Sequence, residues 1–410
     1  MAVSELRRST PALVAGFTVA IVFVAVISIV LTAAGPRGLA LSDRRTSGWI
    51  AMIYGLPLIP AVVLTWRHRM PLLFTGNIFA LIFFASLGHR ESFAELTGAA
   101  MLAGAVVLVT AVLGVTGWLA SWIPTPVVQG LIAGAVLPFV IDVFSSLATS
   151  SQGSPVPVGV PIMVGAAVLA FLVAPRVLGS KLPPILPAFV VGLVVAAVTG
   201  QLGSLPSLFG LPSFQIVRPE LSWTAVLTIT PVLLAVMTVQ SNVPSVIYLR
   251  SQGFDPPERL INVVSGAGTV IGSVFGPVLV SLALPPLLLA ASPAAGEHEI
   301  RYRAIVLPVL VGLSIAVFAG TAAEIAVLIP PVLLLTMAGL ALLPALTSAL
   351  RDLTAGPLLL GPLFAFAIAL SDMTLFGLGP FFWSLVIGTA VSVVFERDGW
   401  RQLRMARAAV

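Results

Sequence analysis

Cysteine is absent from this chain, so disulfides and thiolate chemistry are excluded. Charge is scarce as well: Asp, Glu, Lys and Arg make up 9% of the residues, against about a quarter in soluble domains. Hydrophobic residues account for 59%, and the mean hydropathy is +1.12. This composition excludes a soluble globule and predicts an all-α polytopic membrane protein in which residues 1–410 form a single membrane domain embedded in the lipid bilayer.

Enzyme signatures are also missing. The sequence has no metal-ligand spacing and no glycine-rich phosphate loop, so we expect no enzyme activity, no cofactor and no bound metal. The three histidines, His68, His89 and His298, fall in predicted loops, which argues against a histidine proton relay. The net charge of +5 does not indicate nucleic acid, because the basic residues stand at the ends of apolar stretches.

What the chain has in abundance is long apolar stretches. Two of them, 72–87 and 277–292, are too short or too broken to cross a bilayer comfortably, and we expect half helices there. The full list of fourteen expected segments is 11–34, 47–66, 72–87, 97–120, 124–144, 158–175, 185–200, 223–248, 259–275, 277–292, 302–320, 323–346, 355–371 and 379–396. The half helices are therefore segments 3 and 10.

Landmarks of the first half recur in the second half about 205 residues later. Ile123-Pro124 corresponds to Ile329-Pro330, and Ala133-Gly134 corresponds to Ala338-Gly339. The chain therefore reads as two seven-helix repeats, 1–205 and 220–410. An odd number of crossings places the two copies in opposite orientations, and inverted repeats of this kind are typical of alternating-access transporters.

The positions of the basic residues predict the orientation. With the N-terminus in the cytoplasm and fourteen passes, most Lys and Arg residues fall on the cytoplasmic side, as in other membrane proteins. The exceptions are Arg37, Arg44, Arg45, Arg90 and Arg218. Both termini are therefore expected in the cytoplasm.

One stretch, 227–248, combines an apolar span with a polar cluster. Gln240, Ser241 and Asn242 stand together, and Pro244 follows them. Amides inside hydrocarbon need partners, and a proline removes one backbone donor, so the helix is expected to break at a binding site. The alternative is that these amides only join neighbouring helices.

The two half helices predict the other walls of the site. Their N-terminal ends fall near Thr75, Gly76 and Asn77, and near Gly276 with Pro277. Helix N-termini favour anions, and glycine permits close approach of the backbone to a ligand. Phe23 lies in the middle of the first span and adds an aromatic wall. Together these features favour a small organic acid over a sugar.

Ionisable groups inside the spans are few. Asp142, Glu324 and Asp372 stand near the ends of predicted helices, where a solvated or capping role competes with a role in transport. No acid stands at mid-depth in the central stretch. A proton could therefore travel on the substrate itself or on a group that the sequence does not identify.

Several motifs resemble the benzoate membrane transport proteins, the benzoate–proton symporters of the BenE type. They are residues 11–17 (PALVAGF), 69–71 (RMP), 130–134 (GLIAG), 239–244 (VQSNVP), 251–254 (SQGF) and 337–343 (MAGLALL). The resemblance covers nearly the whole chain and extends to nucleobase–ascorbate and sulfate-permease transporters. It implies core and gate domains, with substrate between the third segment and the tenth, where residues 276–281 add Ser281 to the candidates.

We therefore expect a secondary transporter of a small organic carboxylate, aromatic and benzoate-like, coupled to protons and located in the inner membrane. The substrate-binding candidates are Phe23, Thr75, Gly76, Asn77, Gln240, Ser241, Asn242, Gly276 and Ser281. Alternatives are a transporter or exchanger of another anion or of a nucleobase-like ring, and a channel or structural membrane protein. The expected partners are an organic anion and protons but no nucleic acid. A homo-oligomer is also compatible with the sequence.

Overall fold

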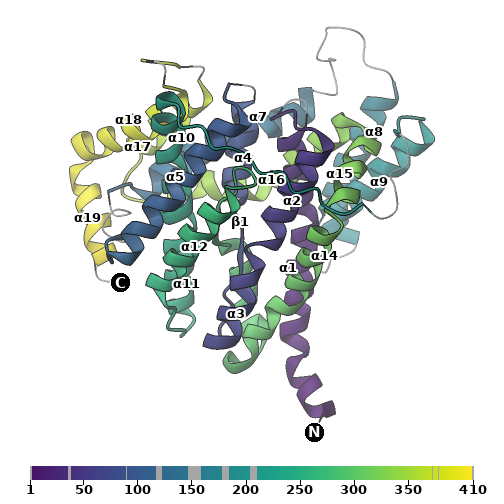
Figure 1. The fold of residues 1–410 in the computed structure, drawn as a ribbon, viewed down its shortest axis with the longest axis horizontal. Coiled ribbons are helices and arrows are strands. Elements are labelled where there is room, and N and C mark those ends of the chain that lie inside the picture. The colour runs from purple at the N-terminus through teal and green to yellow at the C-terminus, as the bar shows by residue number, and fades with distance from the viewer. Residues whose placement is uncertain are drawn as a thin grey trace.

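The structure is a computed structural model that describes residues 2–35, 38–88, 90–116, 122–145, 158–177, 184–203, 210–371, 373–376 and 378–408. Almost all of this is helix, as predicted (Figure 1). The helices of the first half are α1 (Ala2–Ala34), α2 (Asp43–Gly55), α3 (Leu58–His68), α4 (Ile78–Leu87), α5 (Phe93–Val112), α7 (Thr125–Ser145), α8 (Gly159–Val177) and α9 (Ile185–Val198).

The second half holds one long span that contains a π-helical turn, several further helices and a short helix beyond the last span. They are α10 (Trp223–Ala235), η2 (Val236–Asn242), α11 (Val243–Ser251), α12 (Glu258–Gly272), α13 (Leu284–Ala290), η3 (Pro293–Ala295), η4 (His298–Ile305), α14 (Val306–Val317), α15 (Ala319–Leu328), α16 (Pro331–Thr354), α17 (Leu360–Leu370), α18 (Pro380–Phe395) and α19 (Arg397–Ala408). The strands are β1 (Phe74–Gly76) and β2 (Val280–Leu282).

The same order of elements occurs twice. In the first half, α1, α2 with α3, β1 and α4 follow one another, and in the second half α10 with α11, α12, β2 and α13 do the same. The two strands pair antiparallel, with Thr75 opposite Ser281, so the two copies meet at the middle of the molecule. This arrangement is that of an inverted-repeat transporter.

The strand pair provides hydrogen-bond partners for extended backbone, which inside a membrane needs a partner for every N–H and C=O. On their shared edge, Asn77 N–H donates to the Leu279 carbonyl at 2.8 Å, and Ala283 N–H donates to the Leu73 carbonyl at 3.0 Å. On the outer edge of β2, Val280 N–H donates to Thr269 Oγ1 at 2.9 Å. The Thr269 side chain thereby occupies a donor on the outer edge of β2 that would otherwise be open.

The span from Trp223 to Ser251 is continuous, although we expected a break near Pro244. Seven residues, Val236–Asn242, form a π-helix in which the turn widens, and α11 follows with Pro244 in its first turn. Proline removes one hydrogen bond from this continuous helix, and it follows the wider π-helical turn, in which Val243 N–H donates to the Thr238 carbonyl. π-helical turns are frequent at functional sites, and this one carries Gln240 and Ser241.

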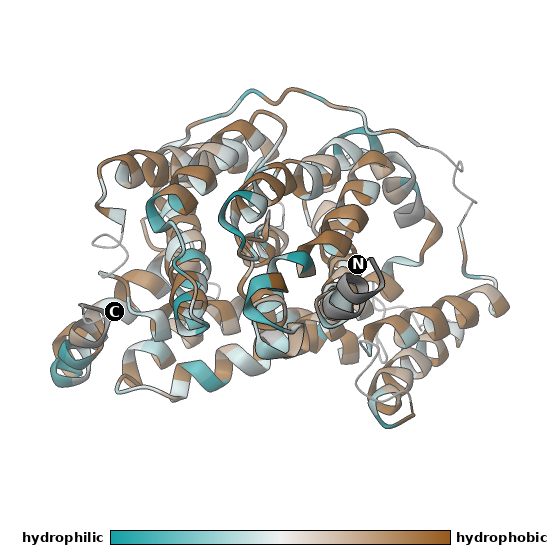
Figure 2. Cartoon of the chain, turned by 90° about the horizontal axis from the view of Figure 1, so that it is seen from below, coloured by the Kyte–Doolittle hydropathy of each residue, from teal (hydrophilic) through white to brown (hydrophobic). Residues whose placement is uncertain are grey.

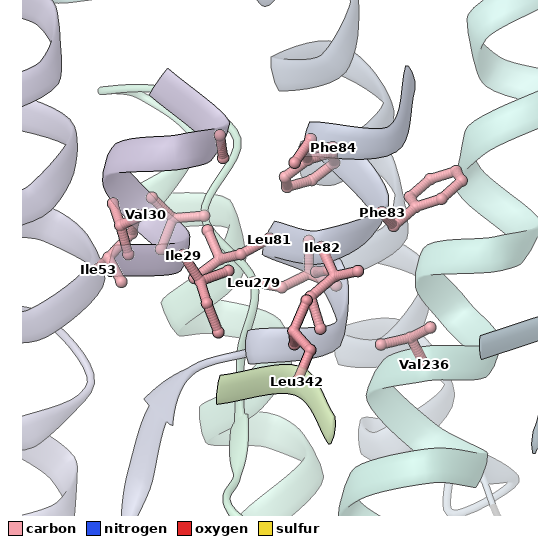
Figure 3. Packing of buried hydrophobic residues seen from close by; sticks show 14 of the residues in the cluster. Ile29, Val30, Ile53, Leu81, Ile82, Phe83, Phe84, Val236, Leu279 and Leu342 are labelled. Atoms are coloured by element: carbon pink, nitrogen blue, oxygen red, sulfur yellow. The ribbon is translucent and has the colours of Figure 1, made fainter. Parts of the chain in front are cut away.

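The helices form two groups. The core domain comprises α1–α5, α10–α14 and both strands, and the gate domain comprises α7, α8, α9, α16, α17 and α18. In Figure 1, α8 and α9 lie at one side and α17 to α19 at the other, with β1 near the middle. Apolar side chains lie where the groups meet: Ile82 of α4 and Leu342 of α16 belong to one buried apolar cluster (Figure 3), and Phe83 of α4 meets Phe381 of α18 edge-on at 5.0 Å.

Several predicted boundaries were wrong. The half helix expected at 277–292 is extended up to Ala283, and only Leu284–Ala290 is helical. The half helix expected at 72–87 begins at Ile78, after a strand. The span expected at 323–346 is divided between α15 and α16, because Pro330 has an extended conformation that interrupts the helix.

Apolar residues cover most helical faces (Figure 2). Within the described ranges, seven helical stretches are long and apolar enough to cross a membrane, or eight if α18 and α19, bent by 106°, count as one. The chain is therefore an integral membrane protein. The count of fourteen segments stays a prediction.

Candidate functional site

A cavity of about 90 Å³ lies where the two repeats meet. Its walls come from α1, α2, β1, α4, η2, β2 and the start of α13. The lining residues are Phe23, Val26, Ile53, Tyr54, Thr75, Gly76, Asn77, Ile78, Phe79, Gln240, Ser241, Ser281, Leu282, Ala283, Leu284, Pro285 and Pro286. Every wall is thus contributed by the core domain.

Asn77 organises the polar end of this cavity. Its Nδ2 donates to Ser241 Oγ at 2.7 Å and to Ser281 Oγ at 2.8 Å, and its Oδ1 accepts from Ala80 N–H at 3.0 Å as the N-cap of α4. An amide nitrogen has two hydrogens, so the Asn77 nitrogen has none left for a ligand. The two serine hydroxyls accept from Asn77 and can each donate their own hydrogen into the cavity.

Gln240 supplies an acceptor that no described residue uses. Its Oε1 is buried and has no hydrogen-bond partner in the structure. A buried polar atom without a partner costs about 1–3 kcal/mol. An unpaired acceptor next to a cavity is explained if a bound ligand donates the missing hydrogen bond to it.

The two half helices contribute unequally. At α4, the amides of Ile78 and Phe79 belong to the first helical turn and have no partner within the helix. At α13, Pro285 and Pro286 have no N–H at all, and Leu287 N–H already donates to the Ala283 carbonyl. We expected two helix ends with free amides around the substrate, but only α4 presents such an end.

The remaining lining of the cavity is largely apolar. Phe23 and Tyr54 meet edge-on with ring centroids 6.2 Å apart, and the Tyr54 hydroxyl donates to the Phe23 carbonyl at 2.9 Å. Ile53, Phe79 and Val26 complete this wall. An apolar cavity of about 150 Å³ holds a benzene ring, so this cavity of about 90 Å³ has to widen to admit an aromatic ring.

Most of the predicted site residues meet at this cavity. Those that line it are Phe23, Thr75, Gly76, Asn77, Gln240, Ser241 and Ser281. Asn242 and Gly276 do not. Asn242 Nδ2 donates to Asn262 Oδ1 and Ser265 Oγ, each at 3.0 Å, while its Oδ1 accepts from Leu282 N–H at 3.0 Å, so it ties β2 to α12.

Gly276 lies before β2 and packs against Trp49 and Phe93. Its φ of +141° is a conformation that residues with a side chain rarely adopt. It shapes the turn that leads into β2 and has no place in the cavity lining.

The acidic candidates lie away from this cavity. Asp142 lines a second cavity of about 250 Å³, together with Arg90, between the core and gate domains. Glu324 stands half-buried in α15. Asp372 falls outside the described residues.

Other lining residues were not among the predicted site residues. Tyr54 and Ile53 lie in the middle of an apolar span, and an aromatic residue with a polar tip at that depth is the signal that could have singled out Tyr54. Leu284, Pro285 and Pro286 fell inside a segment expected to be regular helix. The paired prolines were the available sign that the helix starts there.

Two sequence comparisons agree with this architecture. The family model described as "Benzoate membrane transport protein" (BenE) matches residues 7–394. The chain is 24% identical over 388 residues to the benzoate membrane transport protein of Acinetobacter baylyi, which covers 93% of this chain and 94% of that protein. It is also 24% identical over 398 residues to the inner membrane protein YdcO of Escherichia coli, covering 94% of this chain and 96% of that one.

Solved structures match the fold. The transmembrane domain of the cyanobacterial bicarbonate transporter BicA has a TM-score of 0.55 at 15% identity, covering 95% of this chain and 97% of that one. The murine anion transporter Slc26a9 in its inward-facing state has a TM-score of 0.62 at 14% identity, covering 95% and 68%. These confirm the predicted inverted-repeat transporter fold. Because the family model spans nearly the whole chain, the protein belongs to the benzoate membrane transport protein family of membrane transporters.

Proposed function

We propose that this protein carries a small aromatic carboxylate, of which benzoate is the simplest, across the inner membrane by alternating access, in symport with protons. The observation that carries the proposal is the cavity itself. One end offers the hydroxyls of Ser241 and Ser281, the first amides of α4 and the unpaired Oε1 of Gln240. The rest of the lining offers apolar walls against which a ring can pack once the cavity widens.

The division into core and gate domains supports alternating access. The cavity belongs to the core domain, and part of the contact between core and gate is apolar, as at Phe83 and Phe381. The second cavity, of about 250 Å³, lies between the same two domains and leaves room for one domain to slide against the other. We assign the repeats to residues 1–205 and 220–410, and the recurring element order supports this division.

The site assignment predicts a graded loss of binding. Replacing Gln240 with leucine removes the acceptor, and one hydrogen bond of about 1.4 kcal/mol corresponds to about tenfold in affinity. The matched control is Thr238→Val, because Thr238 lies in the same π-helical segment but binds the Leu234 carbonyl and does not line the cavity. The measurement is benzoate binding to the purified variants, read as ligand-induced thermal stabilisation.

Gln240→Leu should shift the benzoate dissociation constant by about tenfold, and Thr238→Val should leave it unchanged. Equal affinities in the two variants would place the substrate elsewhere.

A neutral ring such as a nucleobase is the second candidate substrate, because the Gln240 amide could pair with ring N–H and C=O groups. Stabilisation by uracil or bicarbonate but not by benzoate would favour the alternative substrates.

We also propose that both termini are cytoplasmic. Arg397, Arg401 and Arg404 follow the last span in α19, and such clusters favour the cytoplasmic side. A C-terminal alkaline phosphatase fusion should therefore be inactive and a C-terminal fluorescent protein active in cells. The reverse result would contradict this orientation and the even number of crossings.

A further inference from the structure

The cavity has almost no ionisable group. Among its lining residues there is no Asp, Glu, Lys, Arg or His, and Tyr54 is the one side chain that could titrate. The Tyr54 hydroxyl already donates to the Phe23 carbonyl. A carboxylate placed here would have no cation to pair with, and burying an unpaired charge is costly.

The elements packed around the cavity keep their charges at their far ends. None of these groups lines the cavity. They are Asp43, Arg44 and Arg45 at the start of α2, Asp142 in the last turn of α7, Arg250 at the end of α11, and Glu258 and Arg259 at the start of α12. A proton carried into the cavity therefore has no acidic or basic side chain there to hold it.

The hydrogen-bonding pattern of the polar end is also informative. Gln240 is 8% exposed, lines the cavity and has an Oε1 without a partner. This atom accepts hydrogen bonds and cannot donate them. An ionised carboxylate has only acceptors, so it would meet this oxygen with repulsion, whereas a carboxylic acid has an O–H to donate.

The remaining groups suit the other oxygen of the same acid. Ser241 and Ser281 stand on opposite sides of Asn77 and can each donate a hydroxyl hydrogen. The first amides of α4 add further donors next to them. Donors for a carbonyl and one acceptor for an O–H are the complement of a neutral carboxyl group.

We propose, on the basis of the function proposed above, that the cavity binds its substrate as the neutral carboxylic acid, which donates its O–H to Gln240 Oε1 and accepts at its carbonyl from Ser241 and Ser281. The coupling proton then crosses the membrane on the substrate. It joins the carboxylate before binding and leaves it after release, so one proton accompanies each substrate and no net charge moves. No side chain of the protein has to change its protonation state.

This mechanism has a measurable signature in pH. Carboxylic acids of this kind titrate near pH 4.3, so at pH 7 about one molecule in 500 is neutral. If the neutral form alone binds, the apparent dissociation constant of benzoate rises about tenfold for each pH unit above 5. Benzamide keeps an N–H donor and a carbonyl without titrating, so its affinity should not change with pH.

The test measures binding of benzoate, benzamide and methyl benzoate to the purified wild-type protein at pH 5.5, 6.5 and 7.5. We expect benzoate to weaken about tenfold per pH unit, benzamide to bind with constant affinity, and methyl benzoate, which has no donor, to bind at least tenfold more weakly than benzamide. Gln240→Leu should remove the preference for benzamide over methyl benzoate, and Thr238→Val should keep it.

Two failures can be told apart. If benzoate binds with the same affinity at all three pH values and benzamide does not bind, the anion is the bound form and this inference is wrong, while the proposed transport function stands. If none of the three ligands binds at any pH while another solute does, the proposed substrate class is wrong, and the inference falls with it.

Discussion

Gly276→Val is expected to prevent the accumulation of folded protein. A Cβ at this position would lie 2.5 Å from Phe93 Cζ and 3.1 Å from Trp49 Cδ1, and the φ of +141° is strained for any residue with a side chain. Strain and overpacking each cost about 1–3 kcal/mol, so their sum is a large part of a typical folding free energy of about 5–15 kcal/mol.

The displaced groups also hold β2 in place. Trp49 and Phe93 form an edge-on pair with centroids 5.9 Å apart, and Trp49 Nε1 donates to the Pro277 carbonyl at 3.1 Å. The measurement is the yield of monodisperse protein and its melting temperature after purification. Gly165→Val is the matched control, because nothing lies within 4 Å of a Cβ at that position. A Gly276→Val protein as stable as this control would contradict the structural role.

Gly76→Val is expected to abolish substrate binding in a protein that still folds. A Cβ here would meet Ile53 Cγ2 at 2.5 Å and the Ile53 carbonyl at 3.0 Å, and both residues line the cavity. Ile53 Cγ2 can move only by rotation about χ1, and the rotated side chain then narrows a space of only about 90 Å³. We expect the affinity for benzoate to fall by at least a hundredfold, equivalent to about 2.7 kcal/mol.

Gly76→Ala adds a single methyl group, so its affinity for benzoate should lie between that of Gly76→Val and that of the wild type. Binding is measured at the pH where the wild type binds benzoate most tightly, on protein that elutes as a single peak. If a folded Gly76→Val protein binds benzoate with wild-type affinity, β1 is not part of the binding site. The two valine variants therefore separate a glycine required by the fold from a glycine required by the cavity, although the sequence had suggested the same role for both.

The overall architecture was accessible from the sequence because membrane helices need long apolar runs and charges gather at their ends. The polar cluster at Gln240 and Ser241 was visible for the same reason, since polar side chains in an apolar span stand out. Asn242 belongs to that cluster, yet it binds Asn262 and Ser265, and no pattern within the cluster separates a residue that faces a ligand from one that faces a helix.

The strand pair was not predictable in the same way. Three residues on each side, such as Phe74–Gly76, carry no alternation that could distinguish a strand from a helix start. Their extended form depends on partners far away in the sequence, among them the Leu73 carbonyl, which accepts from Ala283 N–H. The asymmetry of the half helices, in which Pro285 and Pro286 remove the donors of one end, follows only once the start of α13 is known.

The most direct test of this account is the location of the substrate. Crystals grown with 4-bromobenzoate allow the bromine to be located by its anomalous scattering. The account predicts a single bromine peak among Phe23, Ile53 and Phe79, with the carboxyl group next to Gln240 Oε1 and the serine hydroxyls. A peak in the second cavity, beside Arg90 and Asp142, with none at Gln240, would contradict it.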